Sequence, residues 1–299
     1  MPLIVKRPDI FPEDASNKHT IEFKSPTDGC IVNVDVYSPA NTTGEPLPLV
    51  LGPHPITWTA EEDYHIGFEG YTREYHRGYF GLADKYHVLI AMPHGHEHKE
   101  ELCSLAGPEQ IDDMVYLING LEEFGYNVDK KRVYACGLSM GAQEALVVGG
   151  KYPDRITAVV AFNPIVDLAA WHYELANSEV PEIREYNTAA RIANEVGGTP
   201  EEVPELYAER GALNYVEALT RVPTLVFWSD RELIIPRQLT HHTHLLHERI
   251  MELNPTSPFA AYNHTSIHGP LEFDQLTRWQ LHEWNDYELA LRWLLHHTK

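Results

Sequence analysis

Short apolar segments alternate along this chain with longer segments of helical periodicity, and this alternation constrains the fold most. Apolar runs of about four to eight residues are typical of strands buried in a parallel sheet. Such runs occur at residues 47–51, 87–92, 157–164, 224–229 and 258–263. Between them, residues 109–124 place apolar side chains at helical spacing. The alternation predicts an α/β fold in which right-handed crossovers connect the strands of a mostly parallel central sheet flanked by helices.

Three segments add detail to this scheme. Residues 19–37 predict two strands joined by a hairpin turn at Asp28-Gly29. Residues 167–221 are too long for a simple crossover, so we expect them to form a helical cap or insertion over the sheet's carboxyl edge. A final helix is expected from about Trp279 to His296. We therefore expect residues 1–299 to form a single domain with this insertion.

The composition limits the partners of the chain. Its formal net charge of −21 predicts repulsion from nucleic acid and from anionic membranes. No segment reaches the roughly 20 apolar residues that span a bilayer, and the first residues lack a signal-peptide pattern, so we expect a cytoplasmic location.

Cys30, Cys103 and Cys136 have the spacing of neither a disulfide framework nor a zinc knuckle. We expect reduced cysteines, no cofactor and no metal.

The segment at residues 132–150 carries the chemistry. It reads as a strand, a tight glycine turn and a helix, and the turn is Gly137-Leu-Ser139-Met-Gly141. A serine between two glycines at such a turn exposes its hydroxyl above the sheet, because larger neighbours would clash there. Ser139 is thus the predicted nucleophile of a serine hydrolase.

A nucleophilic serine needs a histidine base and an acid that orients it, in the chain order serine, acid, histidine. The histidine is expected after the last strand, where His264 and His268 compete. His268 is favoured because it precedes Gly269-Pro270 and has a longer loop to bring it over the serine. The acid is expected after the strand at 224–229, where the local sequence does not decide between Asp230 and Glu232.

Two backbone N–H groups must also stabilise the oxyanion of the tetrahedral intermediate. One is expected from Met140, the residue after the nucleophile. The other is expected from the loop after residues 47–51, where Pro55 has no N–H and Ile56 or Thr57 must donate.

From about Asn127 to Gly269 the chain resembles the catalytic domain of the prolyl oligopeptidase family and its related esterases. The likeness lies in residues 127–134 leading into the GLSMG turn, and in residues 197–228 leading into the strand before the acid. The resemblance implies an α/β-hydrolase fold. In such relatives the acid lies four residues before a proline, which places it at Glu232, where the family usually has aspartate.

The resemblance also implies a stand-alone catalytic domain. The family's peptidases carry a large β-propeller, and the residues before the first core strand are too few to form one. This favours a carboxylic-ester hydrolase acting on a small molecule, with a peptidase or amidase for short peptides as the alternative. His54-Pro55-Ile56 stands where relatives often have His-Gly-Gly.

Two groups of histidines suggest other chemistry. His94, His96 and His98 alternate after a predicted strand, and a metal-dependent enzyme that uses them is a further, less favoured hypothesis. A second group is expected on the solvent-exposed face of a helix. It consists of His241, His242, His244 and His247.

Overall fold

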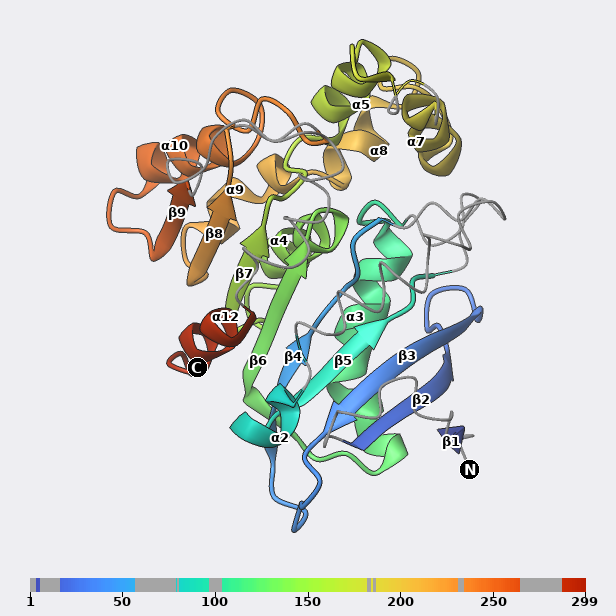
Figure 1. The fold of residues 1–299 in the computed structure, drawn as a ribbon, viewed down its shortest axis with the longest axis vertical. Helices are drawn as coiled ribbons and strands as arrows, with labels where there is room; N and C mark the ends of the chain where they lie inside the picture. Colours follow the sequence, from blue (N-terminus) through green and yellow to red (C-terminus); the bar gives the residue numbers. More distant parts are fainter. Residues whose placement is uncertain are drawn as a thin grey trace.

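A computed structural model of the chain describes residues 4–5, 17–56, 79, 81–96, 104–181, 184, 187–230, 234–263 and 287–299. In this part of the chain, nine strands form one sheet in the order β1-β2-β3-β5-β4-β6-β7-β8-β9 (Figure 1). The strands are β1 (Ile4–Val5), β2 (Asn17–Lys24), β3 (Ile31–Ser38), β4 (Leu47–Leu51), β5 (Leu89–Pro93), β6 (Val128–Leu138), β7 (Ala158–Phe162), β8 (Thr224–Trp228) and β9 (Phe259–Asn263).

Helices fill the connections between these strands. They are α2 (Leu82–Tyr86), α3 (Pro108–Gly120), η2 (Leu121–Phe124), α4 (Met140–Lys151), α5 (Leu168–Ala176), α7 (Thr188–Val196), α8 (Pro204–Glu209), η3 (Ala212–Tyr215), α9 (Val216–Leu219), α10 (Thr243–Leu253) and α12 (Tyr287–Leu294). The predicted α/β fold is confirmed. Of the expected final helix, residues 287–294 are helical, and residues 279–286 lie outside the described part of the chain.

The sheet is parallel from β5 to β9 and antiparallel at its other edge. β2 and β3 form the predicted hairpin, and β3 also pairs antiparallel with β5. The pairs β4–β5, β4–β6, β6–β7, β7–β8 and β8–β9 are all parallel. In a parallel sheet the carboxyl ends of the strands meet at one edge, so the loops that leave them share that edge.

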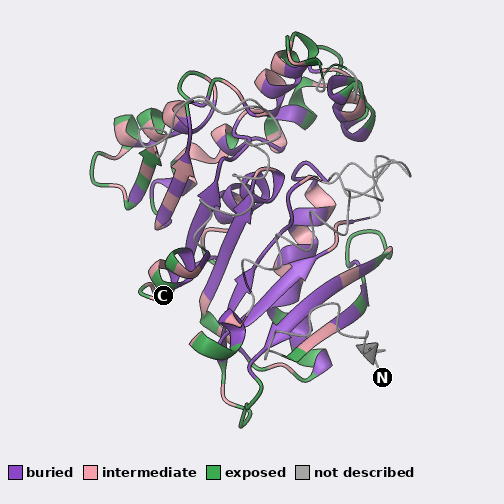
Figure 2. Cartoon of the chain, viewed as in Figure 1, coloured by how far each residue is buried: buried purple, intermediate pink, exposed green. Residues whose placement is uncertain are grey.

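Alternate residues of the central strands pack against opposite layers of helices. Val133 and Ala135 of β6 join a cluster with residues of α3, α4, α9 and α10. Tyr134 and Cys136 join the cluster on the other face, with residues of α2 and α12. Figure 2 shows the buried residues concentrated in the central strands and in the helix surfaces that face them. Cys136 is a buried core residue of β6.

The segment between β7 and β8 is helical, as predicted. Figure 1 shows α5, α7 and α8 gathered at the end of the molecule where β6 and β7 end. Their apolar faces form a third cluster that includes Trp171 and Leu175 of α5 and Met140 of α4. The insertion therefore packs directly against the first residue of the helix that follows Ser139.

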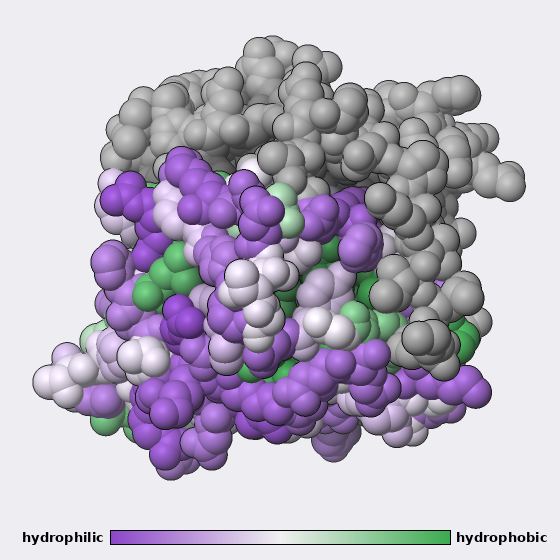
Figure 3. Space-filling model, turned by 90° about the horizontal axis from the view of Figure 1, so that it is seen from below, coloured by the Kyte–Doolittle hydropathy of each residue, from purple (hydrophilic) through white to green (hydrophobic). Residues whose placement is uncertain are grey.

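The opposite end of the molecule is mainly hydrophilic, with small hydrophobic areas between polar side chains (Figure 3). Among the described residues, no helix has the length and apolar character needed to cross a membrane.

Candidate active site

Ser139 occupies a strained turn between a strand and a helix. β6 ends at Leu138 and α4 begins at Met140, so Ser139 alone forms the connection. Its φ of 57° and ψ of −118° are backbone angles that residues with a side chain rarely adopt. The surroundings hold this conformation, because the Ser139 N–H donates to the Phe162 carbonyl at 2.9 Å and the Ser139 carbonyl accepts from the Gln143 N–H at 3.0 Å. Ser139 remains partly exposed.

The two glycines of the motif are required by close backbone contacts. A Cβ on Gly137 would lie 2.2 Å from the Gly141 carbonyl oxygen. A Cβ on Gly141 would lie 2.1 Å from the Pro53 carbonyl oxygen, in the loop that follows β4. The second contact shows that the first turn of α4 lies against the loop that was predicted to complete the oxyanion site.

The two predicted oxyanion donors lie in the same region. The N–H of Met140, at the start of α4, has no acceptor within the helix and lies at its positive end. The buried side chain of Met140 and the partly buried side chain of Ile56 belong to one apolar cluster, with Leu105 and Trp171. The structure brings Met140 and Ile56 together, and their role as donors stays a prediction. Thr57 lies outside the described residues.

A histidine side chain braces the loop after β4, where relatives often have glycines. His54 is buried, and its Nδ1 and Nε2 lie 2.6 Å from the Pro55 carbonyl oxygen and 3.1 Å from the His94 carbonyl oxygen. Carbonyl oxygens only accept hydrogen bonds, so a neutral His54 donates to one of them and an imidazolium donates to both. The loop after β4 is thereby connected to the loop after β5.

The predicted partners of Ser139 belong to loops that start at the same edge of the sheet. β8 ends at Trp228 and β9 at Asn263, and both are parallel to β6 through the pairs that separate them. Asp230 is exposed and follows β8 directly. Glu232, His264 and His268 lie outside the described residues. The roles of Glu232 and His268 stay predictions.

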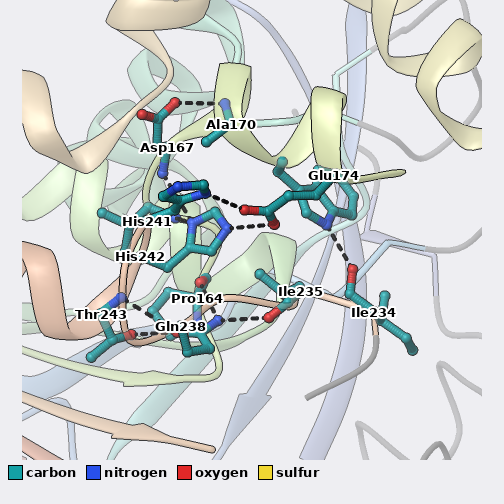
Figure 4. Close-up of polar contacts among 12 residues, drawn as sticks. Pro164, Asp167, Ala170, Glu174, Ile234, Ile235, Gln238, His241, His242 and Thr243 are labelled. Atoms are coloured by element: carbon teal, nitrogen blue, oxygen red, sulfur yellow. Dashed lines mark hydrogen bonds and ion pairs between the residues drawn. The ribbon is translucent and has the colours of Figure 1, made fainter. Parts of the chain in front are cut away.

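Helix α5 fixes the residues that follow the predicted acid. The Trp171 indole N–H donates to the Ile234 carbonyl oxygen at 2.7 Å. The Gln238 amide donates to the Pro164 carbonyl oxygen, which follows β7, at 3.1 Å. Figure 4 shows these contacts around the segment from Ile234 to Thr243. Residues on both sides of the predicted Glu232 position are therefore held, by β8 before it and by α5 after it.

The expectation of a solvent-exposed histidine face is wrong for His242. α10 begins at Thr243, and His242 before it is completely buried. Its Nδ1 accepts from the Val166 N–H at 3.2 Å and the Asp167 N–H at 3.3 Å, so the ring proton must lie on Nε2, which donates to Glu174 at 3.3 Å. Glu174, 68 residues away in sequence, supplies the carboxylate that residue spacing cannot reveal.

His241 pairs with the same carboxylate, and its Nδ1 lies 2.5 Å from Glu174 Oε1 (Figure 4). A cavity of about 680 Å³ borders this contact, lined by residues of α5 and of the segment 236–241. Tyr173, Glu174, Arg237 and His241 contribute polar groups to it. Ser139 is not among its lining residues, so this cavity is separate from the predicted nucleophile.

A buried carboxylate lies on α4, the helix that follows Ser139. Glu144 of α4 accepts hydrogen bonds from the Ser104 hydroxyl and, at 3.2 Å, from the Gln110 side-chain amide. Burial raises the pKa of Glu144 from 4.5 to about 7, because the charged form loses its hydration. The sequence analysis missed this residue, although a carboxylate in the apolar run from Ala142 to Val148 is a signal that can be read.

His94 and His96 do not face a common site. His94 Nε2 lies 3.1 Å from Asp35 Oδ2. His96 is buried, and its Nδ1 and Nε2 face Asp113 and Asp28. His98 lies outside the described residues. The structure therefore separates two of the three histidines that were hypothesised to bind one metal ion.

Comparison with known proteins settles the family. A sequence profile described as the prolyl oligopeptidase family matches residues 86–240, slightly more than half of the 299 residues. The chain belongs to the prolyl oligopeptidase family. The matched segment contains Ser139 and both candidate acids, Asp230 and Glu232. A comparison with curated protein sequences finds no significant match.

Solved structures show the same fold at low sequence identity. An S-formylglutathione hydrolase from Agrobacterium tumefaciens is 15% identical with a TM-score of 0.62, and the alignment covers 99% of each chain. The acylaminoacyl peptidase of Pyrococcus horikoshii is 17% identical with a TM-score of 0.63, over 95% of this chain and 42% of the peptidase. A putative dipeptidyl aminopeptidase IV from Bacteroides ovatus is 17% identical with a TM-score of 0.62, over 94% of this chain and 36% of the other.

The chain thus spans less than half the length of these two peptidases and nearly all of the S-formylglutathione hydrolase. Its α/β-hydrolase fold is confirmed. Its family is one of serine hydrolases, and solved structures with the same fold include esterases and peptidases.

The contact between Gly141 and Pro53 predicts a specific loss of activity. Gly141→Ala places a methyl group against the Pro53 carbonyl oxygen, which must move away from the nucleophile turn. A displacement of about 1 Å at a reacting centre costs on the order of 100-fold in rate. Because Ser139 is the predicted nucleophile, we expect kcat on a chromogenic ester or anilide that the wild type hydrolyses to fall about 10- to 100-fold. Gly198→Ala is the control, because a Cβ there meets its nearest neighbours at 3.2 Å, mainly in side chains that can yield. A wild-type kcat in Gly141→Ala would contradict the contact.

The raised pKa of Glu144 predicts a pH-dependent stability. Because the native pKa of about 7 exceeds the unfolded value of 4.5, the stabilisation is complete below pH 4.5 and is lost as pH rises through 7. This rise in the pKa of Glu144 corresponds to a loss of at most about 3 kcal/mol of unfolding free energy between low and high pH. Urea unfolding between about pH 5 and pH 8 should show a smaller loss of unfolding free energy in Glu144→Gln than in the wild type. Glu217→Gln, at an exposed position of α9, should retain the wild-type dependence. An unchanged dependence in Glu144→Gln would contradict the assignment.

Proposed function

We propose that this enzyme hydrolyses small carboxylic esters through an acyl-enzyme. Ser139 is the nucleophile, His268 the general base and Glu232 the acid that orients His268. The N–H groups of Met140 and Ile56 stabilise the oxyanion. The reaction needs no cofactor in this scheme.

The observation that carries this proposal is the backbone of Ser139. Its angles are ones that residues with a side chain rarely adopt, and backbone strain of this kind is concentrated at functional sites. The backbone of Ser139 places the hydroxyl at the carboxyl edge of the sheet and at the amino end of α4, where the loop after β4 approaches through Gly141. A nucleophile and a site for negative charge are thus adjacent.

The chemistry follows from this arrangement. The Ser139 Oγ forms a bond to the ester carbonyl carbon while its proton passes to His268. The carbonyl π electrons move to the oxygen, which the two N–H groups hold as an oxyanion. When the tetrahedral intermediate collapses, the C–O bond to the alcohol breaks and His268 returns the proton to the departing oxygen. Water then attacks the acyl-enzyme by the same steps and releases the carboxylic acid.

Ester hydrolysis is favoured over peptide hydrolysis by the extent of the structural matches. Two structures covered over most of their length are named as an S-formylglutathione hydrolase, at 99%, and as a fungal esterase of Rhizomucor miehei, at 84%. The named peptidases are covered to 36% and 42%. The alternative is hydrolysis of short peptides or amides, which the same serine chemistry performs and which the family name favours.

Substitution of Ser139 tests the nucleophile and the substrate together. We expect the wild type to hydrolyse p-nitrophenyl esters, and Ser139→Ala to lower kcat by about 10⁴-fold or more. Ser178→Ala, on the turn after α5, is the matched control and should keep wild-type activity. Release of p-nitrophenol is followed by absorbance, beside a panel of aminoacyl p-nitroanilides. Turnover of the anilides without the esters would contradict ester hydrolysis, and an active Ser139→Ala would contradict the nucleophile.

Paired substitutions test the predicted partners. Glu232→Gln should lower kcat by up to about 10⁴-fold, as expected when the base loses its orienting carboxylate, whereas Asp230→Asn should have little effect. His268→Gln should abolish turnover, and His264→Gln should retain it. Comparison of kcat for the four variants on one p-nitrophenyl ester shows which residue of each pair is needed for turnover. A large loss in Asp230→Asn or His264→Gln, with activity kept in its partner variant, would reassign that role.

A further inference from the structure

A second cluster of reactive side chains lies at the tip of the β2–β3 hairpin. Asp28 and Cys30 come from the hairpin turn, and His96 comes from the loop after β5. Asp28 Oδ2 lies 2.9 Å from His96 Nε2 and 3.1 Å from Cys30 Sγ, and one ligand atom of each residue lies within 4.8 Å of the others. We propose that Asp28, Cys30 and His96 bind one divalent transition-metal ion, with Zn²⁺ as the ion that fits best.

His96 is positioned as a metal ligand by groups that hold its Nδ1 and its backbone N–H. Its Nδ1 lies 2.8 Å from Asp113 Oδ2, and its backbone N–H donates to the Gln110 side-chain oxygen at 3.0 Å. The Asp113 side chain is 0% exposed and that of His96 is 5% exposed. Metal-binding histidines commonly donate their other ring N–H to such a carboxylate, which fixes the tautomer and the ring. Nε2 is therefore directed toward Asp28 and Cys30.

The hairpin turn positions the other two ligands. The Cys30 N–H donates to Asp28 Oδ1 at 2.9 Å, which turns Oδ2 toward His96. The Cys30 carbonyl oxygen accepts from the Ser25 N–H at 2.8 Å, and Gly29 adopts the positive φ of 81° that this turn requires. Asp28 is exposed and Cys30 partly exposed, so an ion can enter from solvent and water can complete the coordination.

The donor set selects the ion. One thiolate, one imidazole and one carboxylate suit Zn²⁺ or Co²⁺ better than Mg²⁺ or Ca²⁺, which prefer oxygen ligands. Ligand atoms of a tetrahedral zinc site lie about 3.3 to 3.6 Å apart, as its bond lengths require. The present separations of 2.9 and 3.1 Å call for a small outward movement of Asp28, whose side chain is 41% exposed. Cys30 Sγ and His96 Nε2 lie within 4.8 Å of each other, and rotation of the partly exposed Cys30 side chain can adjust this distance.

The same loop connects this cluster to the active site. The His94 carbonyl oxygen, two residues before His96, accepts from His54 in the loop after β4 when Nε2 carries a proton. An ion on His96 would therefore restrain the loops after β5 and β4 together. Binding itself requires nothing of Ser139, so the metal site and the proposed ester hydrolysis can fail separately.

Metal titration of the full chain tests the site. The protein is first freed of metal with a chelator, which is then removed. We expect calorimetry to show one Zn²⁺ per chain with a dissociation constant of about 1 μM or tighter, and Co²⁺ to give the near-ultraviolet absorption of a cobalt–thiolate bond. Cys30→Ser should remove that absorption and weaken Zn²⁺ binding at least 10-fold. Asp113→Asn should weaken Zn²⁺ binding about 10- to 100-fold, the usual effect of losing a carboxylate behind a histidine ligand.

The control is another histidine–carboxylate pair on the surface. His87 pairs with Glu45 as His96 pairs with Asp28, and His87→Gln should leave the affinity and the Co²⁺ absorption unchanged. His96→Gln should abolish binding, and circular dichroism shows whether each variant is folded. Absence of stoichiometric Zn²⁺ binding, or equal affinity in the wild type and Cys30→Ser, would overturn the proposal and leave Asp28, His96 and Asp113 as a hydrogen-bonded cluster.

Discussion

The close contact between the first turn of α4 and the loop after β4 is the constraint on which the active site depends. Gly141 has no side chain, and this absence lets the Pro53 carbonyl oxygen approach its backbone. The contact fixes the distance between the strand that presents Ser139 and the loop that is predicted to supply an oxyanion donor. Ser139 can then keep a strained backbone, because its N–H donates to the Phe162 carbonyl oxygen and its carbonyl oxygen accepts from the Gln143 N–H.

A network of buried polar groups connects α4 to the loop after β5. Gln110 joins the two halves of the network, because its oxygen accepts from the His96 N–H and its amide donates to Glu144. Removing one member of such a network leaves the next one buried without a partner, which costs more than the bond itself contributes. Gln110 of α3 therefore connects α4 to the loop after β5. The α5 contacts play the corresponding role on the other side, where Trp171 and Glu174 hold the segment after β8.

Local patterns predicted the fold and the strand–turn–helix geometry around Ser139 well, because their physical causes are local; the role of Ser139 as nucleophile stays a prediction. The apolar run at residues 47–51 is β4 itself, and the glycines around Ser139 reflect steric contacts within one turn. The polar clusters could not be predicted, because their partners are distant in sequence. The sequence predicts a solvent-exposed His242, but Glu174 of α5 pairs with its buried ring. It groups His96 with the neighbouring histidines, but the partners of His96 are Asp28 and Asp113. Spacing along a chain carries little information about which buried charge meets which histidine.

The central claim is that Ser139 is the nucleophile of a serine hydrolase, and covalent labelling tests it most directly. A fluorophosphonate reacts when an activated serine oxygen bonds to phosphorus and fluoride leaves. The chain should gain the mass of one adduct, peptide mapping should place it on Ser139, and hydrolytic activity should disappear in proportion to labelling. An adduct on a different residue, or full activity in a chain labelled at Ser139, would contradict the account.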